Sequence, residues 1–363
     1  MRKNIGSYKK NIRLDDSLMV EAYAPLIISA SRSTDIPAFY AEWFFHRLNV
    51  GYSVWKNPYT GKRSYISYED TQFIVFWSKN PASLLDYVDF LEKRNIGFYI
   101  QYTLNDYVRE NLEKNVPPLS FRIDTFKRLV DRLGKGRVIW RFDPLILTDS
   151  ITLDDLLAKI SFIGDQLYGY TEKMVFSFAD ISNYKKVQRN LSMANVHYHE
   201  FTDQLMLQFS ESLIALNQRW NYELSTCGEK IDLYRFGIQH NRCIDDRLLI
   251  RFGHDSKSLM EHLNVKFYSS LAELSGQKTL FDEEMEDKDI IKIDDKNYAV
   301  IQKNNKDKGQ RLYCGCISSK DIGEYNTCPH LCAYCYANMD DPIVLSNWKS
   351  HKKNPFNETI SGK

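Results

Sequence analysis

The chain has 363 residues, and its 48 Lys and Arg residues balance its 47 Asp and Glu residues, so the net charge is +1. With this balance, the chain has no overall electrostatic field that would attract nucleic acid or a membrane surface. The net charge does not exclude a local basic patch. Hydrophobic residues make up 43% of the chain, and we find no stretch that could span a bilayer and no apolar run typical of a signal peptide. We therefore expect a cytoplasmic globular protein with no membrane partner. In a reducing compartment, clustered cysteines bind metal more often than they form disulfides.

The first two thirds of the chain alternate strand-like and helix-like segments. The predicted strands are Leu26–Ser31, Tyr52–Trp55, Phe73–Trp77, Gly97–Thr103, Arg137–Phe142, Met174–Phe178 and Glu223–Thr226. The predicted helices begin at Pro37, at Asn80 with Pro81, at Ser120, at Thr152 with Asp155 as a capping box, and at Thr202. This alternation predicts βαβ units and a parallel sheet. Six or seven units favour a complete or partial (β/α) barrel over a doubly wound open sheet.

The composition changes after this region, which suggests a division into four parts. Residues 1–281 are predicted to form the barrel-like domain and residues 282–310 a charged connector. The connector is acidic over Asp282–Asp289 and basic over Lys303–Lys308, with a candidate short strand at Tyr298–Ile301 between them. Residues 311–340 form a cysteine-rich segment that could bind a cluster. Residues 341–363 are predicted to form a basic tail that is peripheral or poorly ordered.

Polar side chains follow most of the predicted strands, where a barrel enzyme carries its chemistry. The candidates for catalysis are Lys79, Arg141, Asp143 and Glu229, and those for cofactor binding are Arg32 and Asp35. Arg141 and Asp143 are two residues apart on one strand, so their side chains share a face, and Trp140 and Phe142 point to the opposite one. Two structural alternatives stay open: Asp35 caps the helix that begins near Pro37, and Arg141 with Asp143 is a structural ion pair.

Three cysteines near the end of the sequence, Cys328, Cys332 and Cys335, are separated by three and then two residues. A [4Fe–4S] cluster usually takes four thiolates, so a loop that supplies three leaves one iron open, as reactive metal sites require. The alternative is a zinc site in which His330 is the fourth ligand.

The other four cysteines are Cys227, Cys243, Cys314 and Cys316. Four is the number of thiolates that a closed auxiliary [4Fe–4S] cluster needs, so the partition into three and four uses every cysteine. The alternative is that Cys227 and Cys243 are buried apolar side chains, the usual fate of an isolated free cysteine.

The loop Cys328-Pro329-His330-Leu331-Cys332-Ala333-Tyr334-Cys335-Tyr336-Ala337 resembles the cluster loop of radical S-adenosylmethionine (SAM) proteins, in particular the DNA-repair-photolyase-like branch that includes spore photoproduct lyase. Over most of its length the chain resembles the bacterial domain-of-unknown-function 1848 family. The segments that carry this second resemblance are Ser29–Pro37, Phe76–Pro81, Arg141–Pro144, Arg242–Asp245 and the cysteine block.

The first resemblance implies a radical SAM enzyme that makes a 5′-deoxyadenosyl radical and acts on an unknown substrate, with nucleic acid as one candidate and flavodoxin or ferredoxin as reductant. It also implies that Tyr334 packs beside the cluster. In that family the cluster loop follows the first barrel strand, whereas here it comes last, so we expect a circular permutation. The Gly-Gly-Glu stretch that contacts SAM in the family has no counterpart after the first strand. Two rival functions remain: a zinc-stabilised nucleic-acid-binding module and an electron-transfer protein with closed clusters.

Overall fold

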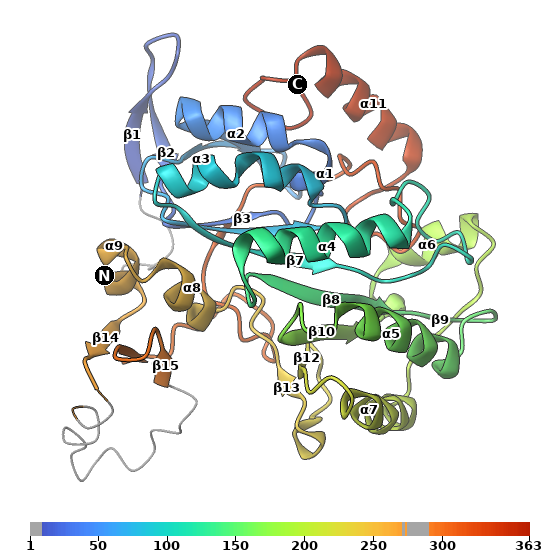
Figure 1. The fold of residues 1–363 in the computed structure, drawn as a ribbon. Helices are drawn as coiled ribbons and strands as arrows, with labels where there is room; N and C mark the ends of the chain where they lie inside the picture. Colours follow the sequence, from blue (N-terminus) through green and yellow to red (C-terminus); the bar gives the residue numbers. More distant parts are fainter. Residues whose placement is uncertain (1–8, 271–272, 274–289) are drawn as a thin grey trace.

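The computed structural model describes residues 9–270, 273 and 290–363. Its centre is an eight-stranded sheet in the order β13-β12-β10-β8-β7-β6-β3-β17 (Figure 1), and every pair of neighbours is parallel. The strands are β3 Ile27–Ala30, β6 Phe73–Ser78, β7 Gly97–Thr103, β8 Val138–Leu145, β10 Lys173–Phe178, β12 Glu223–Thr226, β13 Gln239–His240 and β17 Lys320–Asp321. The predicted α/β class and parallel sheet are confirmed. In the described residues β13 and β17 are the two edges, so no closed barrel is formed.

One predicted strand lies in a different sheet. β4 Tyr52–Lys56 pairs antiparallel with β5 Arg63–Ser67, and these two strands join β1 Lys9–Arg13 and β2 Met19–Tyr23 in a four-stranded sheet. The prediction that it belongs to the parallel sheet is wrong because a local turn decides its partner. The backbone of Asn57 bonds to Lys62 and to Gly61, which closes a hairpin directly after the strand.

Helices cover the large sheet, and Figure 1 shows α3, α4 and α5 following one another along one of its faces. The helices are α1 Ile36–Phe39, α2 Ala41–Val50, α3 Val88–Lys93, α4 Leu119–Leu133, α5 Leu153–Leu167, α6 Lys185–Met193, α7 Asp203–Asn217, α8 Asp246–Gly253, α9 Lys257–His262 and α11 Asp341–Lys353, with 3-10 turns at Ala82–Tyr87, Ile181–Asn183 and Tyr234–Phe236. The capping box of Thr152 and Asp155 is confirmed, as is the cap by Thr202. Asn80 does not cap a helix, because Pro81 precedes the 3-10 turn without a side-chain cap.

Alternate residues of the central strands face two separate cores. Trp140 and Phe142 pack in the larger core with side chains of the covering helices. Ile139 and Val175 pack in a smaller core with Leu249 of α8 and with several cysteines. The strand alternation therefore places polar residues such as Arg141 on the side of the cysteines.

The C-terminal part is more structured than its composition suggests. The strand at Tyr298–Ile301 is confirmed as β16, which pairs with β14 Val265–Tyr268 and β15 Ile290–Lys292. The acidic run Asp282–Asp289 lies outside the described residues. Residues 341–353 form α11, capped by Asp340, and residues 359–361 are buried. The expectation of a poorly ordered tail is therefore wrong for these residues: α11 is a regular helix at the surface, and its Trp348 packs edge-on against Tyr40, with ring centroids 5.4 Å apart.

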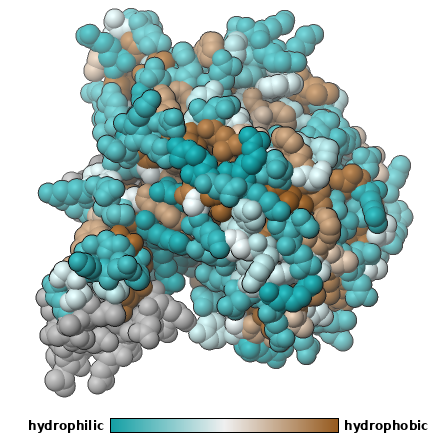
Figure 2. All heavy atoms as spheres, viewed as in Figure 1, coloured by the Kyte–Doolittle hydropathy of each residue, from teal (hydrophilic) through white to brown (hydrophobic). Residues whose placement is uncertain are grey.

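The visible surface is mixed. On the face shown in Figure 2, hydrophilic residues predominate and hydrophobic ones form small groups among them. A short two-stranded ladder, β9 Leu147–Thr148 with β11 Tyr198–His199, lies outside the main sheets. Among the helices in the described part of the chain, none combines the length and the apolar character needed to cross a bilayer.

Candidate functional site

The loop of Cys328, Cys332 and Cys335 is fixed by a second segment of chain, residues 112–115. Cys332 and Glu113 form an antiparallel bridge. Backbone hydrogen bonds run from Ala333 N–H to Leu112 O (2.9 Å) and from Asn115 N–H to His330 O (3.1 Å). Residues 330–333 of the loop are therefore held by the backbone of residues 112–115, and the shape of the loop does not depend on the cysteines alone.

The three cysteines of this loop are half-buried as residues, but their thiols lie in buried surroundings. Burial raises the pKa of all three, and for Cys332 the neighbouring Cys328, Cys335 and Glu113 raise it further while Lys79 lowers it. The three sulfurs are thus within electrostatic reach of one another.

Lys79 supports this loop from the end of β6. Its Nζ donates to Glu113 Oε1 (2.8 Å), Tyr334 OH (2.9 Å) and Asn105 Oδ1 (3.1 Å). An ammonium has three N–H donors, so all of them are used. Burial opposes the charge on Glu113, but Lys79, Arg122 and the hydrogen bond from Tyr334 together keep the pKa of Glu113 below its usual value. The hydroxyl of Tyr334 also donates to Glu113, so Tyr334 is held by polar contacts as well as by packing.

Sequence reasoning missed Glu113, although its side chain is fully buried. It lies in an irregular segment with no motif around it, so no pattern marked it. Only the pairing of residues 112–115 with the cysteine loop shows its position.

Asp35 is a structural anchor for the same loop. Its carboxylate caps α1 by accepting from Ala38 N–H (3.0 Å), and it also accepts from Ser78 Oγ (2.6 Å), Lys79 N–H (2.7 Å) and His330 Nε2 (2.8 Å). The predicted cap is therefore present, and little of the carboxylate is left for a ligand. His330 has its other ring nitrogen 3.2 Å from Asn115 O. Both ring nitrogens of His330 are thus within hydrogen-bond distance of oxygen acceptors in this structure.

The other four cysteines meet at a second place. Cys227 follows β12, Cys243 follows β13, and Cys314 and Cys316 precede β17. The sulfurs of Cys227 and Cys243 are 3.3 Å apart. The backbone N–H of Cys243 lies 3.2 Å from the sulfur of Cys316, and a hydrogen bond from Cys316 helps to lower the pKa of Cys314 to about 6. Three distant segments of chain therefore supply one group of four thiols.

Nitrogen donors surround the sulfurs of this second group. Cys243 Sγ accepts from Asn241 Nδ2 (3.1 Å) and Arg141 Nη1 (3.2 Å). Hydrogen bonds from Cys227 and Cys316, with the nearby guanidinium groups, hold the pKa of Cys243 well below its usual value. A negatively charged thiolate sulfur accepts hydrogen bonds from N–H donors of this kind.

Arg141 and Asp143 form a bonded pair beside the second group. Arg141 is 1% exposed; it donates to Asp143 and to Gln101 Oε1 (3.2 Å), and Asp143 also accepts from Ser177. The two side chains share one face of β8, and they are an ion pair as well as neighbours of the cysteines.

Arg32 links the two cysteine sites. Its carbonyl accepts a hydrogen bond from Tyr336 OH (2.6 Å), which belongs to the loop of Cys328, Cys332 and Cys335, called the first loop below. Burial lowers the pKa of its guanidinium, but the negative charge of Cys316, Asp321 and Cys243 raises that pKa above its usual value. Both Arg32 and Arg141 lie over the ring of Trp77, at 5.4 Å and 5.1 Å from its centroid. Within the described residues, Arg32 Nη2 and Trp77 Nε1 are buried and have no hydrogen-bond partner.

Glu229 lies near Asp143 at the end of β12. It accepts from Phe178 N–H (2.9 Å), and burial, with a smaller contribution from the charge of Asp143, raises its pKa to about 7. Of the predicted site residues, the structure thus places Lys79, Asp35 and Tyr334 around the first loop. Arg32, Arg141, Asp143 and Glu229 lie around the second cysteine group.

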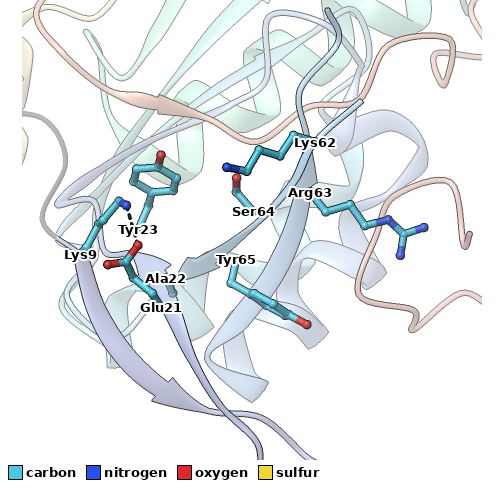
Figure 3. A pocket seen from close by; sticks show the side chains of 8 residues that line it. All are labelled: Lys9, Glu21, Ala22, Tyr23, Lys62, Arg63, Ser64 and Tyr65. Atoms are coloured by element: carbon cyan, nitrogen blue, oxygen red, sulfur yellow. Dashed lines mark hydrogen bonds and ion pairs between the residues drawn. The ribbon is translucent and has the colours of Figure 1, made fainter. Parts of the chain in front are cut away.

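A surface pocket lies elsewhere, on the four-stranded sheet (Figure 3). It is lined by Lys9, Glu21, Ala22, Tyr23, Lys62, Arg63, Ser64 and Tyr65. Lys9 and Glu21 form an ion pair on one side of it, at 2.5 Å. None of the predicted site residues lines this pocket.

All seven cysteines are free thiols. Within residues 9–270, 273 and 290–363, no group of three or more His, Cys, Asp or Glu side chains is arranged as a ready-made site for a metal ion. A four-iron cube is wider than a single ion and holds its thiolates at separate corners. Cys227 and Cys243 would therefore have to move apart to hold one.

The model of one protein family, the domain of unknown function DUF1848, matches residues 27–337. The chain belongs to this family. The matched range includes both cysteine groups and all the predicted site residues, so the family model covers the whole candidate site.

No curated protein matches the chain. One solved structure that is similar to part of it comes from work on the inhibition of the pneumococcal virulence factor StrH and on N-glycan recognition and hydrolysis. The identity is 12% and the TM-score 0.23, and the match covers 60% of this chain and 58% of that one. The chain thus spans less than two thirds of that structure, and so low a TM-score carries no argument about fold or function.

Proposed function

We propose that this member of the DUF1848 family is a radical SAM enzyme with two [4Fe–4S] clusters. Cys328, Cys332 and Cys335 would hold the catalytic cluster. Cys227, Cys243, Cys314 and Cys316 would hold an auxiliary cluster. The observation that carries the proposal is the sorting of seven cysteines into a group of three and a group of four.

The donor set of the first loop fits such a cluster. Three thiolates supplied by one loop would leave a fourth coordination position of a four-iron cluster for a cofactor. The two nitrogens of His330 are engaged by Asp35 and Asn115, so the loop offers no obvious fourth protein ligand. When bound, this cluster would supply the electron that cleaves SAM to the 5′-deoxyadenosyl radical.

The surroundings of the second group also fit a cluster. Its sulfurs accept hydrogen bonds from Arg141, Asn241 and the backbone N–H groups of residues 243 and 244. Arg32 adds a buried N–H with no partner in the described chain, and a cluster sulfur is one acceptor that would satisfy it. Nearby positive charge favours an anionic cluster with four thiolates.

The remaining residues would hold these groups in place. Asp35 and Glu113 would fix the first loop from both sides through His330 and Tyr334. Arg141 would orient Cys243 and balance its charge. A partial barrel in circularly permuted order is consistent with eight parallel strands whose last member, β17, follows the others in sequence but pairs with β3.

Metal analysis tests the proposal directly. Protein reconstituted without oxygen should carry about eight irons and eight sulfides per chain, the content of two four-iron clusters. Replacing Cys328, Cys332 and Cys335 together with alanine should halve both values and leave the second cluster. Stoichiometric zinc without iron in anaerobic preparations would refute the proposal.

A further inference from the structure

The spacing of Cys227 and Cys243 suits a covalent bond between them. Their sulfurs are 3.3 Å apart, whereas a four-iron cube holds its thiolates at separate corners. A disulfide bond is about 2.05 Å long, so the two sulfurs need to approach by about 1.3 Å to form one. The arrangement of this pair is therefore closer to a disulfide than to a cluster.

Hydrogen bonds to the large sheet fix both cysteines at this spacing. Cys227 N–H donates to Phe176 O of β10 (2.8 Å). The carbonyl of Cys243 accepts from Tyr99 OH (2.7 Å) and from Gln101 Nε2 (2.9 Å), both on β7. The fold itself therefore sets the distance between the sulfurs, without any need for a metal.

The two thiols have different surroundings. Cys243 is buried, and its sulfur accepts from Asn241 Nδ2 (3.1 Å) and Arg141 Nη1 (3.2 Å). A neighbouring positive charge favours the thiolate, which is the nucleophilic form of cysteine. Cys227 is half-buried, and its sulfur lies directly against that of Cys243. An attacking thiolate thus has a second thiol beside it that can complete a disulfide.

We propose that Cys227 and Cys243 are a redox-active pair that hydrogen peroxide converts to a disulfide in the cluster-free protein. The Cys243 thiolate attacks one oxygen of the peroxide, the O–O bond breaks, and a sulfenic acid forms on Cys243 while hydroxide leaves. The sulfur of Cys227 then attacks the sulfur of this sulfenic acid, the S–O bond breaks, and the oxygen leaves as water with the proton of Cys227. The two sulfurs lose two electrons in all, and the peroxide gains them. The first hydroxide takes up the proton that Cys243 released.

The disulfide would also control the second cluster, and this part of the inference rests on the proposed function. It removes two of the four thiolates that the cluster needs. An oxidised chain could therefore not assemble that cluster until a thiol reductant cleaves the bond.

The test uses a parent variant, the full chain with Cys328, Cys332 and Cys335 replaced by alanine, so that four of the seven thiols remain. The reduced, metal-free protein is treated with one equivalent of hydrogen peroxide. The remaining thiols are alkylated, and the protein is digested with trypsin without a reductant and analysed by mass spectrometry.

The tryptic peptides separate the possible bonds. Cleavage after Lys and Arg places Cys227 in residues 220–230, Cys243 in residues 243–247 and the other two cysteines together in residues 312–320. We expect peptide 220–230 linked to peptide 243–247, with both thiols of peptide 312–320 alkylated. A main product with a bond to peptide 312–320, or within it, would refute the proposed pair.

Two controls test the steps and the geometry. Cys227→Ser in the parent variant should yield a sulfenic acid on Cys243, trapped by dimedone, and no linked peptide. Peroxide treatment in concentrated urea should give a mixture of pairings, because the unfolded chain no longer holds the two sulfurs together. A linked peptide formed in urea with the same yield as in the folded protein would contradict the role of the fold.

Iron loading keeps this proposal apart from the second cluster. The reduced parent variant should take up about four irons, the peroxide-treated form none, and the peroxide-treated form about four again after dithiothreitol. If the reduced parent variant takes up no iron, the second cluster is refuted, and the peptide map still decides the disulfide. If the disulfide-linked form loads as much iron as the reduced form, the control of loading is refuted.

Discussion

Replacing Arg141 with methionine should destabilise the metal-free protein substantially. Arg141 is 1% exposed, and methionine keeps most of its volume while removing the charge. Breaking one partner of a buried ion pair costs about 3–5 kcal/mol because the other charge loses its compensation. The Asp143 side chain retains 23% exposure, so water offsets part of this cost and we expect a loss of about 3 kcal/mol.

Urea unfolding of the metal-free chain measures this loss. With a denaturant dependence of about 3 kcal/mol per molar urea, the midpoint should fall by about 1 M. The double variant Arg141→Met with Asp143→Asn removes the uncompensated charge, so it should recover part of the loss. A double variant no more stable than Arg141→Met would refute the reasoning. An unchanged midpoint in Arg141→Met would contradict a structural role for the ion pair.

Three further predictions follow from other sites. Gly323→Ala should destabilise the fold by about 1–3 kcal/mol, because its added carbon would lie 1.9 Å from Ser31 Oγ; an unchanged melting temperature would contradict the close packing seen there. Burial lowers the pKa of Lys320 from 10.5 to about 8, so its charge costs stability below pH 8 and the cost disappears as the pH rises towards 10.5. Lys320→Met should therefore raise the melting temperature at pH 7, with a smaller gain at pH 10; a gain independent of pH would show that the charge is not responsible. Cys332→Ala should abolish reductive cleavage of SAM to 5′-deoxyadenosine in reconstituted protein, whereas Cys314→Ala should retain part of it, and equal loss in both would argue against two separate sites.

Local patterns in the sequence predicted local structure well. The capping box at Thr152 and the strand at Gly97–Thr103 were both found, because each depends on a few neighbouring residues. The sheet to which β4 belongs was not found, since its partner is decided by the hairpin after Asn57 and not by its own composition. Sheet assignment is a property of pairs of segments, which a single segment does not reveal.

The candidate site was predictable to a similar extent. Spacing identified the loop of Cys328, Cys332 and Cys335, and counting alone suggested that the other four cysteines belong together. That Cys227 and Cys243 meet at 3.3 Å depends on the neighbouring positions of β12 and β13, which no spacing rule contains. Asp35 was assigned to either a cap or a ligand contact, and its four hydrogen-bond donors could be seen only once β6 and the cysteine loop lay beside it.

The short edge strand β17 separates the two cysteine groups in sequence, with Cys316 before it and Cys328 after it. Its Asp321 accepts from Ser29 Oγ and from Arg32 N–H, both at 2.8 Å. These two hydrogen bonds join β17 to an N-terminal segment of the chain, which the ribosome makes first. While the ribosome is still making the residues after β17, the large sheet has most of its strands but the first loop has none of its cysteines. If the first loop holds the proposed cluster, iron can enter it only after the strands of the large sheet have been synthesised, so the nascent chain would not carry an exposed, oxygen-sensitive cluster.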